Sequence, residues 1–129
     1  MSELLIIDTD ILIDIGRNNK VAIERLKLEK DKYELAVSVI TEMELVIGCR
    51  NKTELKYVEQ FLEGFEILSL NLEISRKAVD LLKQYRLSHG LLIADSLIAA
   101  KAIIFNAALL TKNQKDFKFI KGLRFLKYP

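Results

Sequence analysis

Short apolar runs alternate along this chain with longer stretches in which apolar residues recur at helical spacing, and this alternation constrains the fold more than any other feature. The first run is Leu4-Leu5-Ile6-Ile7, which ends at the polar segment Asp8-Thr9-Asp10. A continuous apolar run of this length is typical of a strand buried on both faces. The pattern therefore predicts an α/β fold, a three-layer α/β/α sandwich around a central, mainly parallel sheet of four or five strands.

The expected elements follow one another in the order that such a sandwich requires. Strands are expected over residues 4–7, 35–40, 65–70, 107–110 and 123–126. Helices are expected over residues 11–15, 21–28, 41–49, 54–65, 72–87 and 94–105. Gly90 should end the fifth helix, because glycine readily adopts a left-handed conformation. The last helix is rich in alanine and isoleucine, so it should be buried on more than one face.

The composition narrows the class of protein. The chain has 129 residues, half of them hydrophobic, which predicts a single domain over residues 1–129. Its longest run without charged residues is too short for a membrane span, which needs about 20 apolar residues. The only cysteine, Cys49, fits a reducing cytoplasm. One histidine and one cysteine exclude most zinc sites, so any metal should be a hard ion held by oxygen.

The charge is unevenly distributed along the chain. The formal net charge of +2 does not by itself indicate a nucleic-acid-binding surface. From Lys112 onward, however, basic residues far outnumber the single acid, Asp116. This basic end predicts either a surface for a phosphate backbone or a solvated edge that resists aggregation.

Four acids are expected at the carboxyl ends of the strands. Asp8 directly follows the first strand, and Glu44 lies in the first turn of the helix after the second. Asp95 begins the alanine-rich helix, and Asp116 lies a few residues beyond the fourth strand. Ligands of open parallel sheets gather at this edge, where the order of the strands reverses. The four acids are therefore candidates for one site.

Each acid also has a purely structural interpretation. Asp8 or Asp10 could cap the helix near residue 11, and Thr41 with Glu44 matches the spacing of a capping box. Asp95 could be the N-cap of its helix. Asp116 could be an ordinary exposed residue among lysines.

Asp95 is the hardest of the four to explain as a cap. It is flanked by apolar residues on both sides, and a dehydrated carboxylate costs several kcal/mol without a partner. Capping would return only about 0.5–2 kcal/mol. Lys101, at i+6, points about 120° away around an ideal helix. A divalent cation, Mg²⁺ or Mn²⁺, would relieve the repulsion among clustered carboxylates, activate a water and neutralise a phosphoryl oxygen.

Four stretches resemble the PIN-domain ribonucleases, in particular the VapC-like toxins of toxin–antitoxin pairs. They occur in the family's order and are 5–13, 38–45 with Gly48, 93–100 and 110–117. The resemblance implies an α/β/α sandwich that cleaves RNA endonucleolytically with Mg²⁺. It also implies a cognate antitoxin as partner and a homodimer.

The same resemblance assigns roles to individual residues. Asp8 and Asp95 would be the principal metal ligands, and Glu44 and Asp116 would complete the site directly or through water. Three polar residues would help to hold the pocket: Thr9, Thr111 and Asn113. Two further acids leave the assignment open. Glu42 points about 160° away from Glu44 on a helix, so only one of them should face the site. Asp10 could join the site or only cap a helix.

Two other functions compete with this interpretation. The strand followed by Asp8-Thr9-Asp10 also resembles the opening of haloacid-dehalogenase-like phosphatases, which form an aspartyl phosphate. Alternatively, a PIN-like domain could bind RNA or a partner without cutting. Outside the acids, Cys49 is expected in the core, and the spacing of Tyr57, Phe61 and Phe65 predicts a core stripe or an antitoxin or dimer surface.

Overall fold

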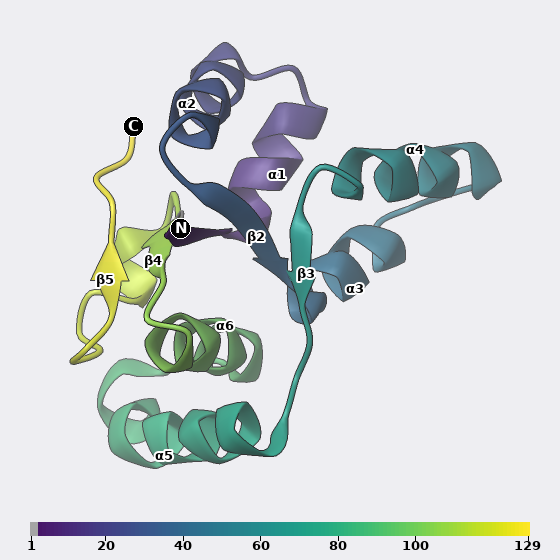
Figure 1. Cartoon of the computed structure of the whole chain (residues 1–129). Helices are drawn as coiled ribbons and strands as arrows, with labels where there is room; N and C mark the ends of the chain where they lie inside the picture. Colours follow the sequence, from purple (N-terminus) through teal and green to yellow (C-terminus); the bar gives the residue numbers. More distant parts are fainter. Residues whose placement is uncertain (1–2) are drawn as a thin grey trace.

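A parallel five-stranded sheet forms the centre of the computed structural model, which describes residues 3–129 (Figure 1). The first two residues of the expected domain lie outside the described range. The strand order is β3-β2-β1-β4-β5, and every neighbouring pair is parallel. The strands are β1 (Leu4–Ile7), β2 (Glu34–Ser38), β3 (Glu66–Leu68), β4 (Ala108–Leu110) and β5 (Arg124–Phe125). The expected parallel sheet is confirmed.

Helices cover both faces of this sheet. They are α1 (Thr9–Gly16), α2 (Lys20–Lys30), α3 (Val39–Ile47), α4 (Lys52–Leu62), α5 (Leu72–His89) and α6 (Ile93–Ile104), with a short 3-10 helix over Gln114–Asp116. Leu5 and Ile7 of β1 pack in one core cluster with residues of α1, α2 and α4, whereas Ile6 packs in a second cluster with residues of α5 and α6. Alternate side chains of one strand thus face two helical layers, as the predicted three-layer sandwich requires.

The strand order reverses at β1. The chain runs from β1 through β2 to β3 on one side and then returns to place β4 on the other side of β1 (Figure 1). The carboxyl ends of β1 and β4 therefore lie side by side at the reversal, with Ile7 paired to Leu110. This is the position at which open α/β sheets bind ligands.

The second strand is shorter than expected, and the reason is local. Ser38 ends β2, and its Oγ accepts a hydrogen bond from the Ile40 N–H at 3.0 Å, so it is the N-cap of α3. Val39 and Ile40 therefore begin the helix although their side chains favour strands. The expected strand over 35–40 was too long at this end. A serine in an apolar run was the signal for the boundary.

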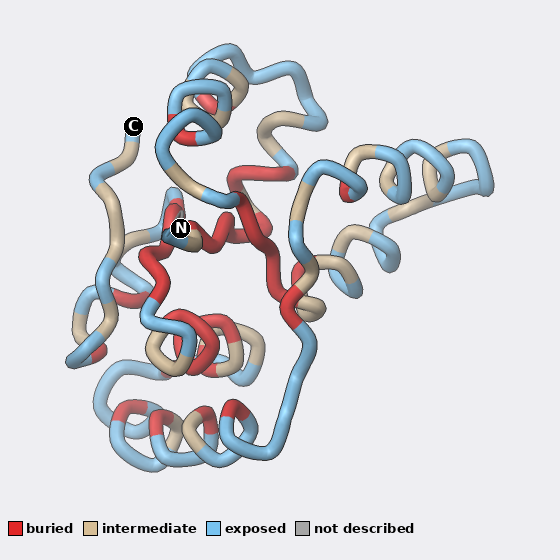
Figure 2. The backbone as a smooth tube through the Cα atoms, viewed as in Figure 1, coloured by how far each residue is buried: buried red, intermediate tan, exposed pale blue. Residues whose placement is uncertain are grey.

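Helices α5 and α6 form the other layer. Gly90 ends α5 with φ of 72°, as expected for a left-handed cap. Leu92 is the N-cap residue of α6 and makes no side-chain capping hydrogen bond, so interpreting Asp95 as the N-cap is wrong. Buried residues lie on several sides of α6, which confirms its expected burial, and Figure 2 shows α6 and the central strands mainly in red.

Few residues of the α3–α4 pair are buried. The pair extends from the carboxyl end of β2, and Leu62 is the only buried residue among the described residues of α4 (Figures 1 and 2). Within residues 3–129, no helix is both long and apolar enough to cross a membrane.

Candidate active site

Asp8 lies at the centre of the candidate site, directly after β1 and at the N-cap of α1. Its Oδ1 accepts a hydrogen bond from the Thr9 N–H at 2.9 Å, and its Oδ2 accepts one from Thr111 Oγ1 at 2.7 Å. Asp8 is 7% exposed. Burial, followed by the charge of Asp10, raises its pKa to about 7, although these two hydrogen bonds oppose the rise. Asp8 is both a helix cap and one of the acids gathered at this edge of the sheet, which we call the acidic group. The two interpretations of Asp8 therefore do not exclude each other.

Asp10 faces the loop that follows β4. Its Oδ2 accepts a hydrogen bond from the Lys112 N–H at 3.2 Å and lies 3.4 Å from Thr111 Oγ1. Burial raises the pKa of Asp10, and its charge acts on both Asp8 and Asp95. Asp10 therefore belongs to the acidic group, a role that the sequence left open. Its nearness to the β4 loop depends on the pairing of β1 with β4.

Glu44 reaches the same region through a chain of hydroxyl groups. Its Oε1 accepts a hydrogen bond from Thr9 Oγ1 at 2.8 Å, and Thr9 Oγ1 lies 2.9 Å from Thr41 Oγ1. Because Thr9 has one hydroxyl proton, donation to Glu44 leaves Thr9 to accept from Thr41. Ser38, not Thr41, caps α3, so the capping-box interpretation is wrong. Thr41 is a supporting residue that the sequence reasoning missed.

Asp95 lies in the first turn of α6 and is partly buried. Burial and the charges of Asp116, Glu44 and Asp10, in that order, raise its pKa to about 6. All of these effects act in the same direction. Three acids from separate elements thus act on this one carboxylate, as expected for acids gathered at one edge of the sheet.

The loop after β4 supplies the remaining predicted residues. Thr111 is buried, and its Oγ1 accepts a hydrogen bond from the Asn113 N–H at 3.1 Å while donating to Asp8. The backbone of Asn113, rather than its exposed side chain, makes this contact. Asp116 is exposed at the end of the 3-10 helix, and its negative charge raises the pKa of Asp95.

The donor set suits a hard divalent cation. It consists of carboxylate and hydroxyl oxygens, the ligands that Mg²⁺ and Mn²⁺ prefer. As the side chains stand, no three acidic, histidine or cysteine residues within 3–129 are arranged to hold a metal ion together. Asp8 is buried and Asp95 partly buried, and burial together with neighbouring acids raises the pKa of both carboxyl groups. A divalent cation bound between them would offset this negative charge.

An apolar groove of about 600 Å³ begins beside Glu44 and runs between α1, α3 and α4. Leu12, Leu45 and Phe61 line it, and Tyr57, which is 65% exposed, lies along it. The core interpretation is therefore wrong for Tyr57. The observed surface agrees with the alternative, a face available to a partner.

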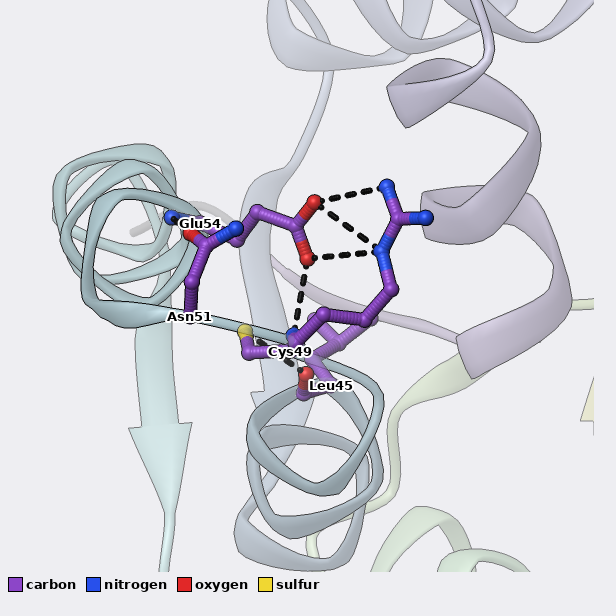
Figure 3. Close-up of polar contacts among 5 residues, drawn as sticks. Leu45, Cys49, Asn51 and Glu54 are labelled. Atoms are coloured by element: carbon purple, nitrogen blue, oxygen red, sulfur yellow. Dashed lines mark hydrogen bonds and ion pairs between the residues drawn. The ribbon is translucent and has the colours of Figure 1, made fainter.

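Cys49 lines the same groove. It follows α3 instead of lying within a helix, is only partly buried, and its Sγ donates to the Leu45 carbonyl at 3.4 Å (Figure 3). The expected core position of Cys49 is wrong, because the chain turns there toward α4. At this turn, Arg50 pairs with Glu54 at 2.9 Å.

Comparisons with known proteins agree with the observed fold. The PIN domain matches residues 5–123. Ribonuclease VapC10 of Mycobacterium tuberculosis is 31% identical over 122 residues, covering 94% of this chain and 91% of that protein. Ribonuclease VapC1 of Methanocaldococcus jannaschii is 34% identical over 119 residues, covering 91% of this chain and 81% of that protein.

Solved structures show the same similarity. VapBC2 from Rickettsia felis, bound to a DNA fragment from its promoter, has a TM-score of 0.82 at 27% identity, covering 98% of this chain and 99% of that one. A toxin–antitoxin complex from Klebsiella pneumoniae has a TM-score of 0.80 at 28% identity, covering 95% and 96%. The chain therefore belongs to the PIN-domain family, as a relative of its VapC ribonucleases.

Proposed function

We propose that this chain is a Mg²⁺- or Mn²⁺-dependent endoribonuclease and the toxin of a toxin–antitoxin pair, acting as one PIN-like domain over residues 1–129. The observation that carries the proposal is that acids from three other elements gather near Asp95 of α6 at one edge of the sheet. Burial and the charges of Asp116, Glu44 and Asp10 raise its pKa to about 6, at the sheet edge where ligands bind. The ribonuclease relatives support RNA as the substrate.

Different residues of this chain have different roles in the proposed metal site. Asp8 and Asp95 would be the principal metal ligands, and Glu44 and Asp116 would complete the set directly or through water. When bound, the ion supplies an activated water and neutralises charge on a phosphoryl oxygen. The Thr9 N–H and the Thr111 hydroxyl orient the two oxygens of Asp8.

The basic end of the chain supports binding of a phosphate backbone. Lys112 forms an ion pair with Asp14 at 2.9 Å, and Arg124 forms one with Glu3. The charges of these two residues are therefore already paired within the protein. Lys115, Lys118 and Lys121 are exposed around the 3-10 helix that carries Asp116. Lysines beside acids can hold an RNA strand by its phosphates while the acids hold the ion.

The groove beside Glu44 suits an antitoxin. An apolar channel of about 600 Å³ exceeds what a single side chain fills, so it fits an extended or helical segment of a partner. Occupation of the groove would also cover Glu44, which lines it. The solved VapBC and toxin–antitoxin complexes support a protein partner of this kind.

We also propose a homodimer, with the cytoplasm as the place of action. Leu87 is fully exposed, and Leu92 and Ile93 are 58% and 71% exposed, so the end of α5 and the start of α6 form an apolar surface. Exposed apolar patches of this kind often mark protein interfaces. The only cysteine and the RNA substrate support a cytoplasmic location.

Neither alternative function gains support. Family membership does not favour a haloacid-dehalogenase-like phosphatase. A PIN-like module that binds RNA without cutting it differs from our proposal in one measurable outcome, cleavage itself.

The test is RNA cleavage by the purified protein with Mg²⁺. We expect EDTA and Asp95→Asn each to abolish cleavage. The matched control is Asp80→Asn, because Asp80 is an exposed acid on α5. This variant should cleave RNA like wild type. Undiminished cleavage by Asp95→Asn would contradict the site, and a wild-type protein that binds RNA but never cuts it would favour the binding module.

A further inference from the structure

Lys101 of α6 is a buried lysine that the proposed chemistry does not use. It is 0% exposed and is among the largest fully buried side chains. Its Nζ donates a hydrogen bond to Ser38 Oγ at 2.7 Å and another to the Leu68 carbonyl. Both acceptors are uncharged, and among the described residues Lys101 forms no salt bridge. Desolvation lowers its pKa to about 8.

Core packing does not account for a lysine at this position. Removing an ammonium group from water is unfavourable, and two neutral acceptors compensate it only in part. Apolar residues of similar volume often replace buried charged groups with no loss of stability, or with a gain. Methionine, which is long and flexible, would fill the same space. A buried lysine of this kind indicates a role other than stability.

The two acceptors show what Lys101 connects. Ser38 is the last residue of β2 and the N-cap of α3, so its Oγ both accepts from Lys101 and holds the first turn of α3. Leu68 is the last residue of β3, at the edge of the sheet. Lys101 thus ties α6 to the start of α3 and to the end of the neighbouring strand.

These connected elements carry two of the proposed metal ligands. Helix α3 carries Glu44, together with Thr41 of the hydroxyl chain, and α6 carries Asp95 six residues before Lys101. The two helices also contact each other directly. Each ligand therefore lies on a helix whose placement depends in part on the contacts of Lys101.

We propose that Lys101 is a positioning residue, which fixes helix α3 relative to helix α6 so that Glu44 and Asp95 can share one divalent ion. This inference rests on the proposed function. It assigns Lys101 no contact with the ion or with RNA. Its effect on the site is indirect, through Ser38.

The test separates metal binding from stability. Mn²⁺ alone is titrated into metal-free wild type, Lys101→Met and Ser38→Ala, with thermal unfolding measured on the same samples. Lys101→Met removes the donor and keeps the bulk, and Ser38→Ala removes the acceptor from the other end. Ile98→Val is the matched control, because Ile98 is buried on α6 at 1% exposure and takes no part in the link. Asp95→Asn serves as the reference for loss of a ligand.

We expect Lys101→Met to keep or raise the melting temperature and to weaken Mn²⁺ binding about tenfold or more, the usual effect of residues that orient metal ligands. Ser38→Ala should weaken binding in the same direction, and Ile98→Val should lower the melting temperature while binding Mn²⁺ like wild type.

Binding within about twofold of wild type in both folded variants would overturn the inference, since outer-shell changes usually exceed this. So would an equal loss in Ile98→Val, or failure of both variants to fold, because each outcome would mean that Lys101 only supports the core. If wild type binds no Mn²⁺, the proposed function fails and this inference fails with it. If wild type binds Mn²⁺ and Asp95→Asn does not, wild-type Mn²⁺ binding by both Lys101→Met and Ser38→Ala overturns this inference and leaves the proposed function standing.

Discussion

Thr111 donates a hydrogen bond to Asp8 Oδ2 at 2.7 Å across 103 residues of sequence. The contact is possible because β4 pairs with β1, with Leu110 opposite Ile7. It lowers the pKa of Asp8 against the opposing effect of burial. One threonine on the β4 loop therefore orients an acid that follows the first strand.

Replacing Thr111 with valine tests this contact while keeping the shape of the side chain. Loss of the donor should raise the pKa of Asp8 further, so more of the carboxylate is protonated near neutral pH. We expect the rate of RNA cleavage to fall about tenfold. The pH at which the cleavage rate rises should also shift upward. A pH–rate profile measures both effects. A variant with the wild-type profile would contradict the orienting role.

The acidic group should make the metal-free protein less stable as the pH rises. Asp8 and Asp95 have pKa values of about 7 and about 6 in the folded state, above the ordinary value of 3.8. The folded state therefore binds protons more tightly than the unfolded state, and this contribution to stability is lost as pH rises from about 4 through about 7. The expected loss is on the order of a few kcal/mol and comes mostly from Asp8, because solvent screening reduces the contribution of the more exposed Asp95.

Urea unfolding in EDTA at about pH 5 and about pH 8 measures this dependence. The paired variant Asp8→Asn with Asp95→Asn should flatten it, and Asp80→Asn should keep it. Equal or greater stability of wild type at the higher pH would show that burial and neighbouring charges do not raise the pKa values of these carboxylates in the folded state.

Tyr57 provides a test of the groove that leaves the acids intact. Tyr57→Ala removes an exposed ring that lines the groove, so we expect a cognate antitoxin to bind at least about tenfold more weakly, as for an aromatic interface residue. RNA cleavage by the free protein should stay unchanged. Leu72→Ala, a change at an exposed residue of α5, is the control. Equal antitoxin binding by wild type and Tyr57→Ala would place the partner elsewhere.

Leu87 tests the proposed dimer surface. A charge placed in the apolar patch by Leu87→Glu should convert dimers to monomers, because a buried carboxylate at an interface is unfavourable. Sedimentation velocity distinguishes the two species. Val21→Glu, at an exposed residue of α2, should remain dimeric. A dimeric Leu87→Glu protein would exclude this patch as the interface.

Much of the fold could be predicted from the sequence because its signals are local. The apolar run Leu4-Leu5-Ile6-Ile7 predicts a buried strand whatever elements surround it. Gly90 predicts the end of α5 because glycine readily adopts the left-handed conformation found there. The end of β2 was misplaced because Val39 and Ile40 favour strands, whereas the capping bond from Ile40 to Ser38 decides the boundary.

The site was predictable only in outline. Strand order and the rule for parallel sheets bring Asp8 and Asp95 to one edge, but they do not specify which hydroxyl meets which carboxylate. The Thr41–Thr9–Glu44 chain depends on how α3 packs against α1, and the neutral partners of Lys101 depend on the packing of α6. Contacts of this kind arise from tertiary structure and leave no pattern in the sequence.

The most direct test of the central claim is anomalous diffraction from crystals of the wild-type protein soaked in Mn²⁺. We predict a peak between Asp8 and Asp95, with carboxylate oxygens at roughly 2.0–2.2 Å, typical of small divalent ions. The peak should be absent in Asp95→Asn crystals. A fully occupied Mn²⁺ ion elsewhere on the molecule, with none between these two acids, would contradict the account.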